Sequence, residues 1–392
     1  MSRSSETGSL TLWNAPGSLP TVARVAVIGD FLPAWKVAAE QRPMTTPAHW
    51  RQKARDLELC LNDTSISVVN CECPLDCAGL EARPLNGLGD IVSAPSECLD
   101  YLTGIRANIV GIANNHSYDF GAEGVERTRR AIADHGCTPL GAGCTLADAP
   151  EIFVWQGPGR IRVGFWAAAR ATTNPSKRNL AGVEPATLRH ARKALRAMKE
   201  QNASCCVALL HAGCLRASHP APEDMEAIDS LAHAGFDIVA ASHSHRISGA
   251  KMISRCDEQP AFCFYGLGTI VSGFAASAVE REGLIAVASL DQEGHLARIE
   301  VRVVLLEENG FGAVPSTTNA SIILDRFRRL SAHIDDGSCA ERFYQEISPG
   351  LLRLYVRDAR RAVEQGGVRG LARKAWRVRM RHVVRLLHSV LS

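Results

Sequence analysis

The sequence of 392 residues is long enough for one large α/β domain with an appendage, and its 46% hydrophobic and 22% charged residues are typical of a globular chain with a full core. Ordinary counts of glycine (32) and proline (18) exclude collagen-like and low-complexity architectures. A formal net charge of +3 is too small to indicate a nucleic-acid-binding protein by itself.

The charge is distributed unevenly along the chain. Residues 341–392 contain 12 Lys and Arg against 4 Asp and Glu, a surplus of +8, so the first 340 residues carry the balance of −5. The main body is therefore mildly acidic, and the last fifty residues form a basic segment that needs its own explanation.

Cysteine usage and the search for targeting segments indicate a cytoplasmic protein. The 13 cysteines are an odd number, and several of them, such as Cys205, Cys206 and Cys263, lie inside apolar runs as reduced buried thiols do. The first 20 residues lack the charged-then-apolar pattern of a signal peptide. Residues 261–279 are uncharged but contain three glycines with Ser and Thr, which favours strand and loop over a bilayer helix.

The predicted elements alternate between strand and helix after a polar leader over residues 1–20. Buried strands are predicted where apolar and β-branched residues run together: 22–28, 65–69, 109–112, 161–167, 205–210, 236–240, 261–267, 284–290 and 297–306. Helices are predicted from amphipathic spacing: 47–61, 98–104, 124–135, 187–202 and 223–234. This alternation predicts an α/β fold with functional residues at strand ends. A Pro/Ser/Thr/Asn patch at 315–321 separates a domain over 21–310 from a basic helical C-terminal extension over 321–392.

Potential metal ligands follow five of the predicted strands. They are Asp30, Glu72, the Asn114-Asn115-His116 run, His211, and the pair His243 and His245. Acids, an amide and imidazoles at one sheet edge could hold two divalent ions, a donor set suited to hydrolysis. Taken singly, a strand-end Asp is often a helix cap, Asn-Asn is often a turn, and a lone His is often a core residue. The His-Ser-His pair is stronger, because strand alternation would point both rings to one side.

Several motifs in this order resemble the CapA family of polyglutamate capsule-synthesis proteins, which are built on the calcineurin-like metallophosphoesterase fold. The motifs are Gly29-Asp30, Asn70-Cys71-Glu72-Cys73-Pro74, Ala113-Asn114-Asn115-His116 with Asp119 and Gly121, Gly124-Val125 with Thr128, His211-Ala212-Gly213, Gly235-Phe236-Asp237, His243-Ser244-His245 and Tyr265 to Gly268. The resemblance covers about residues 22–290. It implies a four-layer α/β/β/α sandwich with a C-terminal helical extension.

The resemblance also implies a dinuclear site and assigns its residues. Asp30 and His245 would hold one ion, Asn115, His211 and His243 would hold the other, and Glu72 would bridge them. His116 would be the catalytic acid near the leaving group, and Asn114 and Asp119 would bind substrate. The metals would be Mn, Fe or Zn, because the ligand types alone do not choose between them.

The sequence departs from the family pattern around this site. Position 32 is Leu where metallophosphoesterases usually have a His, so the first metal position is short of one ligand. The family's His-Trp-Gly-x-Glu is here His211-Ala-Gly-Cys-Leu215, its His-Pro-His is His-Ser-His, and its Asn after Ser-Leu-Gly is Thr269. The metal ligands are retained while the residues that would line a substrate pocket differ.

Other features carry weaker signals. Cys71, Cys73 and Cys77 lack a second CxxC for a zinc site, and no GxSxG elbow is present. Gly141-Ala-Gly143 is a possible substrate-proximal turn, while Arg170 and Lys177-Arg178 could meet an anionic substrate or form a solvated loop.

Three functions remain open. The first is a CapA-type hydrolase in polyglutamate capsule synthesis or processing, in which metal-bound hydroxide attacks a phosphoester or a glutamyl amide. The second is a non-catalytic assembly or export factor that uses the basic segment 351–392 to bind the inner membrane surface or capsule-synthesis proteins, although that segment could equally pack on the domain. The third is a nucleotide phosphodiesterase. An anionic polymer or phosphoester is the expected substrate, and no nucleic acid partner is expected because no aromatic stacking platform accompanies the basic residues.

Overall fold

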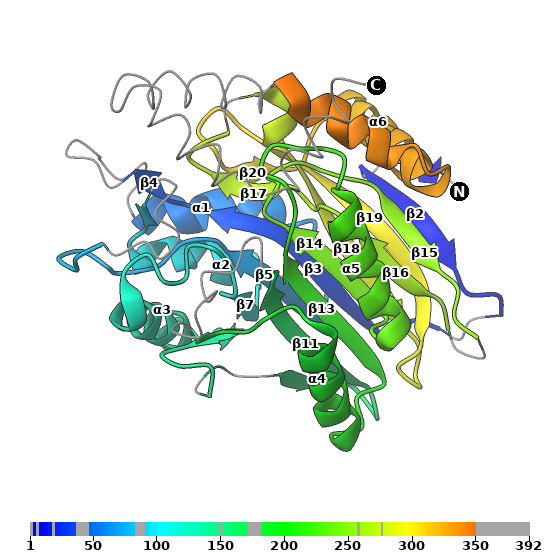
Figure 1. The fold of residues 1–392 in the computed structure, drawn as a ribbon, viewed down its shortest axis with the longest axis horizontal. Coiled ribbons are helices and arrows are strands. Elements are labelled where there is room, and N and C mark those ends of the chain that lie inside the picture. The colour runs from blue at the N-terminus through cyan, green and yellow to red at the C-terminus, as the bar shows by residue number, and fades with distance from the viewer. Residues whose placement is uncertain are drawn as a thin grey trace, which may run out of the picture.

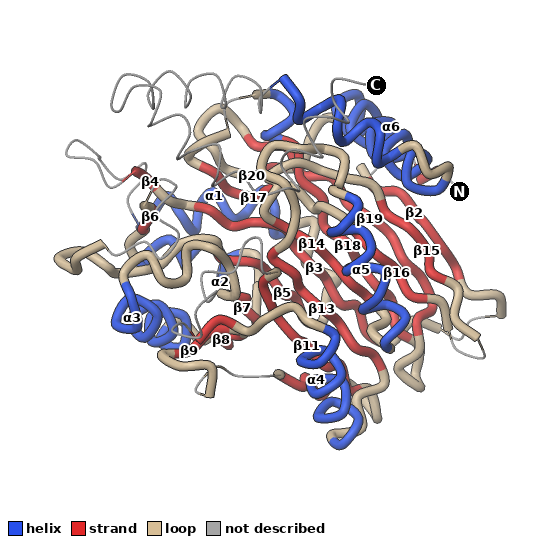
Figure 2. The backbone as a smooth tube through the Cα atoms, viewed as in Figure 1, coloured by secondary structure: helices blue, strands red, loops and turns tan. Residues whose placement is uncertain are grey.

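The computed structural model describes residues 3–4, 8–17, 20–36, 47–82, 91–147, 149, 152–170, 182–256, 259–275 and 277–349 (Figure 1). Two β-sheets occupy the middle of the molecule, and helices flank them (Figure 2). The basic segment 351–392 and the dipeptide Lys177-Arg178 lie outside the described residues.

The larger sheet contains ten described strands and places β1 and β2 from the N-terminal region beside β19 from residues 296–306. Its order is β1-β2-β19-β18-β3-β5-β7-β8, with β17 beside β3 and β20 beside β19. The strands are β1 (Arg3–Ser4), β2 (Ser9–Asn14), β3 (Ala23–Leu32), β5 (Ile66–Cys71), β7 (Ile109–Gly111), β8 (Thr138–Leu140), β17 (Thr269–Ser272), β18 (Glu282–Leu290), β19 (Leu296–Leu306) and β20 (Gly312–Ala313). Strands β3, β5, β7 and β8 are parallel, so their carboxyl ends share one edge.

The smaller sheet has six described strands in the order β10-β11-β13-β14-β16-β15. They are β10 (Phe153–Gln156), β11 (Arg162–Ala169), β13 (Cys205–His211), β14 (Ile238–Ser242), β15 (Ala250–Ile253) and β16 (Ala261–Phe264). The four central strands are parallel, and β10 and β15 are antiparallel edges. Two short pairs stand apart: β9 (Ala142–Gly143) with β12 (Gly182–Val183), and β4 (Trp35–Lys36) with β6 (Val92–Ser93).

Six α-helices with defined bounds among the described residues connect or cover these strands. They are α1 (Pro47–Glu58), α2 (Leu99–Gly104), α3 (Gly121–Asp134), α4 (Leu188–Glu200), α5 (Pro222–Ala234) and α6 (Thr317–Asp335), accompanied by the 3₁₀ turns η1 (Ser96–Cys98) and η2 (Ala278–Arg281). A further helical stretch follows at 339–349. None of the helices in these ranges is both long and apolar enough to cross a bilayer.

Strand β13 shows how the layers pack on one another. Its residues are apolar up to the final His211. Alternate residues Cys205, Val207 and Leu209 join the large core cluster between the sheets. Their neighbours Cys206, Ala208 and Leu210 join a second cluster with residues of α4 and α5. A strand covered on both faces reads as a continuous apolar run. The predicted four-layer α/β/β/α sandwich is therefore confirmed, with a core on each side of the smaller sheet.

The predicted polar leader over residues 1–20 is corrected by the structure. Ser9–Asn14 form β2, which pairs with β19, and Leu10 is buried with 1% exposure. The alternation of apolar and polar residues that is typical of a strand was not recognised here, because this strand is short and polar residues surround it on both sides.

The start of the predicted C-terminal extension also belongs to the sandwich. Helix α6 buries Ile323, Phe327 and Leu330 in the same cluster as the strands of the larger sheet. The hydroxyl of Ser331 accepts a hydrogen bond from the backbone N–H of Ala250 on β15 at 3.0 Å. Residues 317–335 thus pack on the domain rather than apart from it.

Candidate metal centre

The predicted metal ligands lie at adjoining strand ends of the two sheets. Their positions are Asp30 on β3, Glu72 just after β5, Asn115 in the turn after β7, His211 at the end of β13, and His243 and His245 just after β14. Strands β3 and β5 run in parallel in one sheet, and β13 and β14 run in parallel in the other. The carboxyl ends of both pairs therefore deliver these side chains to one place.

The first group of ligand atoms belongs to Asp30, Glu72 and His245, and these atoms lie within 4.8 Å of one another. Nδ1 of His245 is 3.1 Å from Oδ2 of Asp30, and its Nε2 is 3.6 Å from Oε2 of Glu72. Both carboxylates are buried, at 0% and 1% exposure. Leu32 is buried and supplies no ligand, so this group has three side chains.

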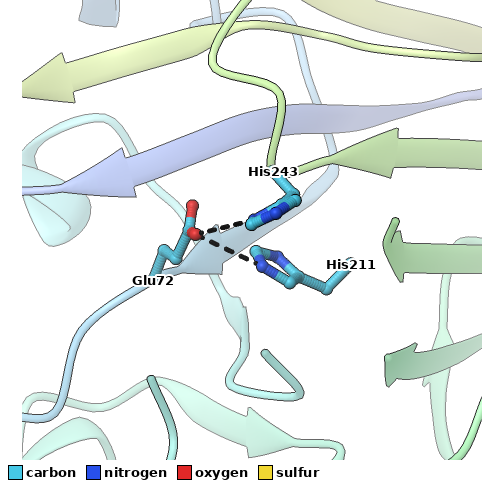
Figure 3. Close-up of side chains that lie close together, drawn as sticks. All are labelled: Glu72, His211 and His243. Carbon is cyan, nitrogen blue, oxygen red and sulfur yellow. Dashed lines mark hydrogen bonds and ion pairs between the residues drawn. The ribbon is translucent and has the colours of Figure 1, made fainter. Parts of the chain in front are cut away.

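The second group is formed by Glu72, His211 and His243 (Figure 3). Nε2 of His211 and Nδ1 of His243 each lie 3.2 Å from the same carboxylate oxygen, Oε1 of Glu72. The amide oxygen of Asn115 is 2.5 Å from Nε2 of His211 and adds a fourth donor. The two groups share Glu72, which is the position of a bridging ligand.

The histidines of the site favour the charged form of the Glu72 carboxylate. Burial would raise the pKa of Glu72, but the imidazoles of His245 and His211 hold that pKa well below its usual range. Burial opposes protonation of His245 as well, yet Glu72 and Asp30 raise its pKa to about 9. Burial lowers the pKa of His211, which favours the neutral ring that ligates metals.

One atom of this arrangement has the surroundings that suit a bound cation. Oε2 of Glu72 is buried and has no hydrogen-bond partner among the described residues. A buried carboxylate oxygen without a donor costs free energy that a cation would offset. Mixed carboxylate, amide and imidazole donors suit Mn, Fe or Zn. The residues present therefore fit divalent metal ions.

The two histidines of the His-Ser-His motif converge through a turn and not through strand alternation. Strand β14 ends at Ser242, and His243 and His245 adopt positive φ angles of 109° and 56°. The backbone N–H of His243 donates to Oδ2 of Asp30 at 2.9 Å, which fixes the turn against β3. The prediction that both rings share one side is met, but the physical reason given for it is wrong.

His116 is oriented by the aspartate three residues after it. Nδ1 of His116 lies 2.7 Å from Oδ2 of Asp119, and the side chain of His116 is 17% exposed. Burial would lower the pKa of His116, but the hydrogen bond and charge of Asp119 outweigh it and raise this pKa. The imidazolium form, which can give up a proton, is thereby favoured.

The two predicted substrate-binding residues bond to the chain itself. Asn114 is 1% exposed; its Nδ2 donates to the carbonyl of Cys71 at 2.7 Å, and its Oδ1 accepts from the N–H of His116 at 3.1 Å. Asp119 is 5% exposed and directed at His116. Both side chains thus have hydrogen-bond partners within the chain, and their role in substrate binding stays a prediction.

The remaining sequence features stand outside this centre. Cys71, Cys73 and Cys77 are buried, and no described cysteine joins a group that could hold a metal. All thirteen cysteines are unbridged. The guanidinium of Arg170 is paired with Asp224 at 3.0 Å, which favours a structural role over contact with an anion. Gly141 has a φ of 94° and is tightly packed on β11, where an added Cβ would lie 2.6 Å from the carbonyl oxygen of Ala167.

Two residues touch the predicted ligands although no such contact was assigned to them from the sequence. Nδ2 of Asn70 donates to Oδ1 of Asp30 at 2.7 Å and lies 3.3 Å from Nδ1 of His211, so one amide contacts both groups. The hydroxyl of Thr269 is 3.4 Å from Nδ1 of His245. The signal for Asn70 was its place on β5 two residues before Glu72, where alternation directs both side chains to the same face.

We expect Asn70→Ala to weaken Mn²⁺ binding by about 10–100-fold, because partners that orient ligands contribute on that scale. Isothermal titration of the purified chain would measure the change. Ser67→Ala is the matched control, since Ser67 lies on the same strand, is also buried, and bonds to the carbonyl of Arg106 away from the site. Equal Mn²⁺ affinities for both variants would show that Asn70 does not orient ligands.

Two of the solved structures that resemble this chain do so at low sequence identity. A 5'-nucleotidase precursor from Thermus thermophilus is 12% identical with a TM-score of 0.46, over 78% of this chain and 58% of that one. The calcineurin-like phosphoesterase YfkN from Bacillus subtilis is 13% identical with a TM-score of 0.43, over 79% of this chain and all of that one.

Comparison with curated proteins and families gives a more specific result. The capsule biosynthesis protein CapA of Bacillus anthracis is 26% identical over 186 residues, which is 46% of this chain and 44% of that protein. The matched stretch thus spans less than half the length of the relative. The profile of the family described as bacterial capsule synthesis protein PGA_cap matches residues 24–273, more than half of the chain and all of the predicted metal ligands. The chain therefore belongs to the bacterial capsule synthesis protein PGA_cap family.

Proposed function

We propose that this chain is a metal-dependent hydrolase in the synthesis or processing of a polyglutamate-type capsule polymer, acting on a phosphoester or a glutamyl amide. The observation that carries the proposal is the pair of ligand groups that share Glu72, whose buried Oε2 lacks a hydrogen-bond partner among the described residues. Family membership supports the capsule context.

The residues of the site would have different roles in hydrolysis. Two divalent ions held by these groups would supply Lewis acidity at the scissile bond and a lowered pKa for water. Asp119 holds Nδ1 of His116, which leaves Nε2 as the ring nitrogen that gives a proton to the leaving group. The hydrogen bond and charge of Asp119 raise the pKa of His116, which favours the protonated form that can give this proton.

The substrate and the location belong to the same proposal. An anionic polymer or phosphoester is the expected substrate, with Mn, Fe or Zn as the metal. A cytoplasmic location is supported by thirteen unbridged cysteines. Residues 351–392 would hold the protein at the inner membrane surface or on capsule-synthesis proteins.

A second candidate function is a non-catalytic assembly or export factor. The observation that favours it is Leu32, a buried apolar residue where the resembling phosphoesterases have a further ligand. A first ion held by only three side chains would be labile, and a protein that lost it would retain the fold as a scaffold.

Metal content and turnover distinguish these functions. We expect the purified chain to contain about two divalent ions and to hydrolyse bis-p-nitrophenyl phosphate, and we expect His211→Ala and His243→Ala to lose both properties. Elemental analysis and absorbance assays on the same samples would measure this. Metal without turnover would favour amide chemistry or the scaffold, and no metal in the wild type would exclude the hydrolase.

A further inference from the structure

The loops that carry the histidine ligands are covered by a part of the chain far away in sequence. Residues 212–221 follow His211, and residues 243–249 contain His243 and His245. The helical stretch 339–349, which comes after α6, lies against both loops. It is outside residues 24–273, the range that the family profile matches.

Apolar contacts seat this helix on the first loop. Phe343 is fully buried and forms a separate small cluster with Ala217 and Ala221. Tyr344 and Ile347 pack at its margin from the helix side. Because this cluster is separate from the two main cores, its packing serves the contact between the helix and residues 212–221.

A single carboxylate then bonds to both loops. Oε1 of Glu346 accepts from the backbone N–H of Ser218 at 2.9 Å and from Nη1 of Arg246 at 2.9 Å. Its Oε2 accepts from the backbone N–H of His219 at 3.1 Å and lies 3.0 Å from Nδ1 of the same residue. Arg246 directly follows the ligand His245, so Glu346 joins the two histidine loops through charge-assisted hydrogen bonds.

The loops are also bonded to each other in a backbone conformation that needs support. The N–H of Arg216 donates to the carbonyl of Ser244 at 2.9 Å. Arg216 has a φ of 61°, and His243 and His245 also have positive φ angles. Side-chain-bearing residues adopt this region at a cost in free energy, and they keep it only where surrounding contacts hold them.

We propose that Glu346 is a positioning residue of the metal centre. It holds the two loops in the arrangement in which His211, His243 and His245 converge on Glu72, without touching metal or substrate itself. The proposal rests on the metal centre proposed above and adds a residue from outside the family-matched range.

Glu346→Gln tests this role, with Glu341→Gln as the matched control. Both substitutions remove one negative charge from the same helix, but Glu341 is exposed and accepts a hydrogen bond from Gln345 of that helix. In the full chain stripped of metal, hydrogen exchange of peptides covering 212–221 and 243–249 is expected to accelerate about tenfold or more in Glu346→Gln and to stay unchanged in Glu341→Gln. Calorimetric titration with Mn²⁺ is expected to show about 10–100-fold weaker binding by Glu346→Gln only.

The outcomes separate the proposal from a purely local role and from the metal centre itself. Faster exchange confined to 339–349, with wild-type Mn²⁺ affinity, would mean that Glu346 stabilises only its own helix, and the proposal would be overturned. If the wild type binds no Mn²⁺, the metal centre falls, while faster exchange of both loops still supports the positioning role.

Arg246→Met provides a second variant should Glu346→Gln not fold. It removes the bond to 243–249 and retains those of Glu346 to 218–219. Faster exchange in 243–249 alone and weaker Mn²⁺ binding are expected. No change in either measurement would overturn the proposal.

Discussion

Glu72→Gln is expected to remove both metal ions and with them the turnover of bis-p-nitrophenyl phosphate. Both ligand groups contain Glu72, and His211 and His243 both approach its Oε1 at 3.2 Å. A neutral amide keeps the shape of the side chain but cannot donate two anionic oxygens. The loss in metal affinity should exceed the roughly 10–100-fold that follows when a partner of a ligand is removed.

The matched control for Glu72→Gln is Glu300→Gln. Glu300 is also a buried carboxylate in the larger sheet, at 7% exposure, but it lies on β19 and pairs with Arg298 and Arg302. We expect its substitution to leave metal content at the wild-type level. A Glu72→Gln protein that kept both ions would show that the two groups do not share this residue as a ligand.

His116→Gln should retain metal and lose proton donation. Nδ1 of His116 bonds to Asp119, so in the proposed reaction the other ring nitrogen would give the proton to the leaving group. General acid catalysis contributes about 10²–10⁴-fold, and its contribution grows as the leaving group becomes more basic. We expect a loss of that size for an alkyl phosphodiester and a smaller one for bis-p-nitrophenyl phosphate, measured as kcat on metal-replete protein.

Asp119→Asn provides the companion variant for this prediction. The amide still accepts or donates one hydrogen bond but no longer stabilises the imidazolium, so kcat on the alkyl ester should fall by less than in His116→Gln. Equal losses on both esters for His116→Gln would assign this residue to substrate binding instead of proton transfer.

The positions of the proposed ligands could be predicted from the sequence because each one lies at or just beyond the end of a strongly apolar run. Parallel strands bring their carboxyl ends to one edge, so Asp30 and Glu72, separated by 42 residues, meet without any further information. The sequence did not show where the side chain of Asn114 bonds, because its contacts with the carbonyl of Cys71 and the N–H of His116 depend on how the backbone packs.

The sequence did not reveal the residues that are proposed to position the metal ligands without binding metal themselves. Asn70 lies inside a buried strand, where its amide bridges Asp30 and His211 only because the two sheets meet there. Glu346 is separated from Arg246 by 100 residues and belongs to no motif. Alternation along β5 places Asn70 on the same face as Glu72, but its partners, like those of Glu346, depend on how distant segments pack.

The position of β18 in the larger sheet bears on which fragments of this chain can be expressed alone. Strand β3, which carries Asp30, pairs with β18 along residues 23–28, and β18 comes from residues 282–290, beyond the end of the family match at 273. A recombinant fragment trimmed to the matched range would present β3 with an open apolar edge, the kind of surface that leads to aggregation. The segment recognised by the profile is thus shorter than the unit that folds.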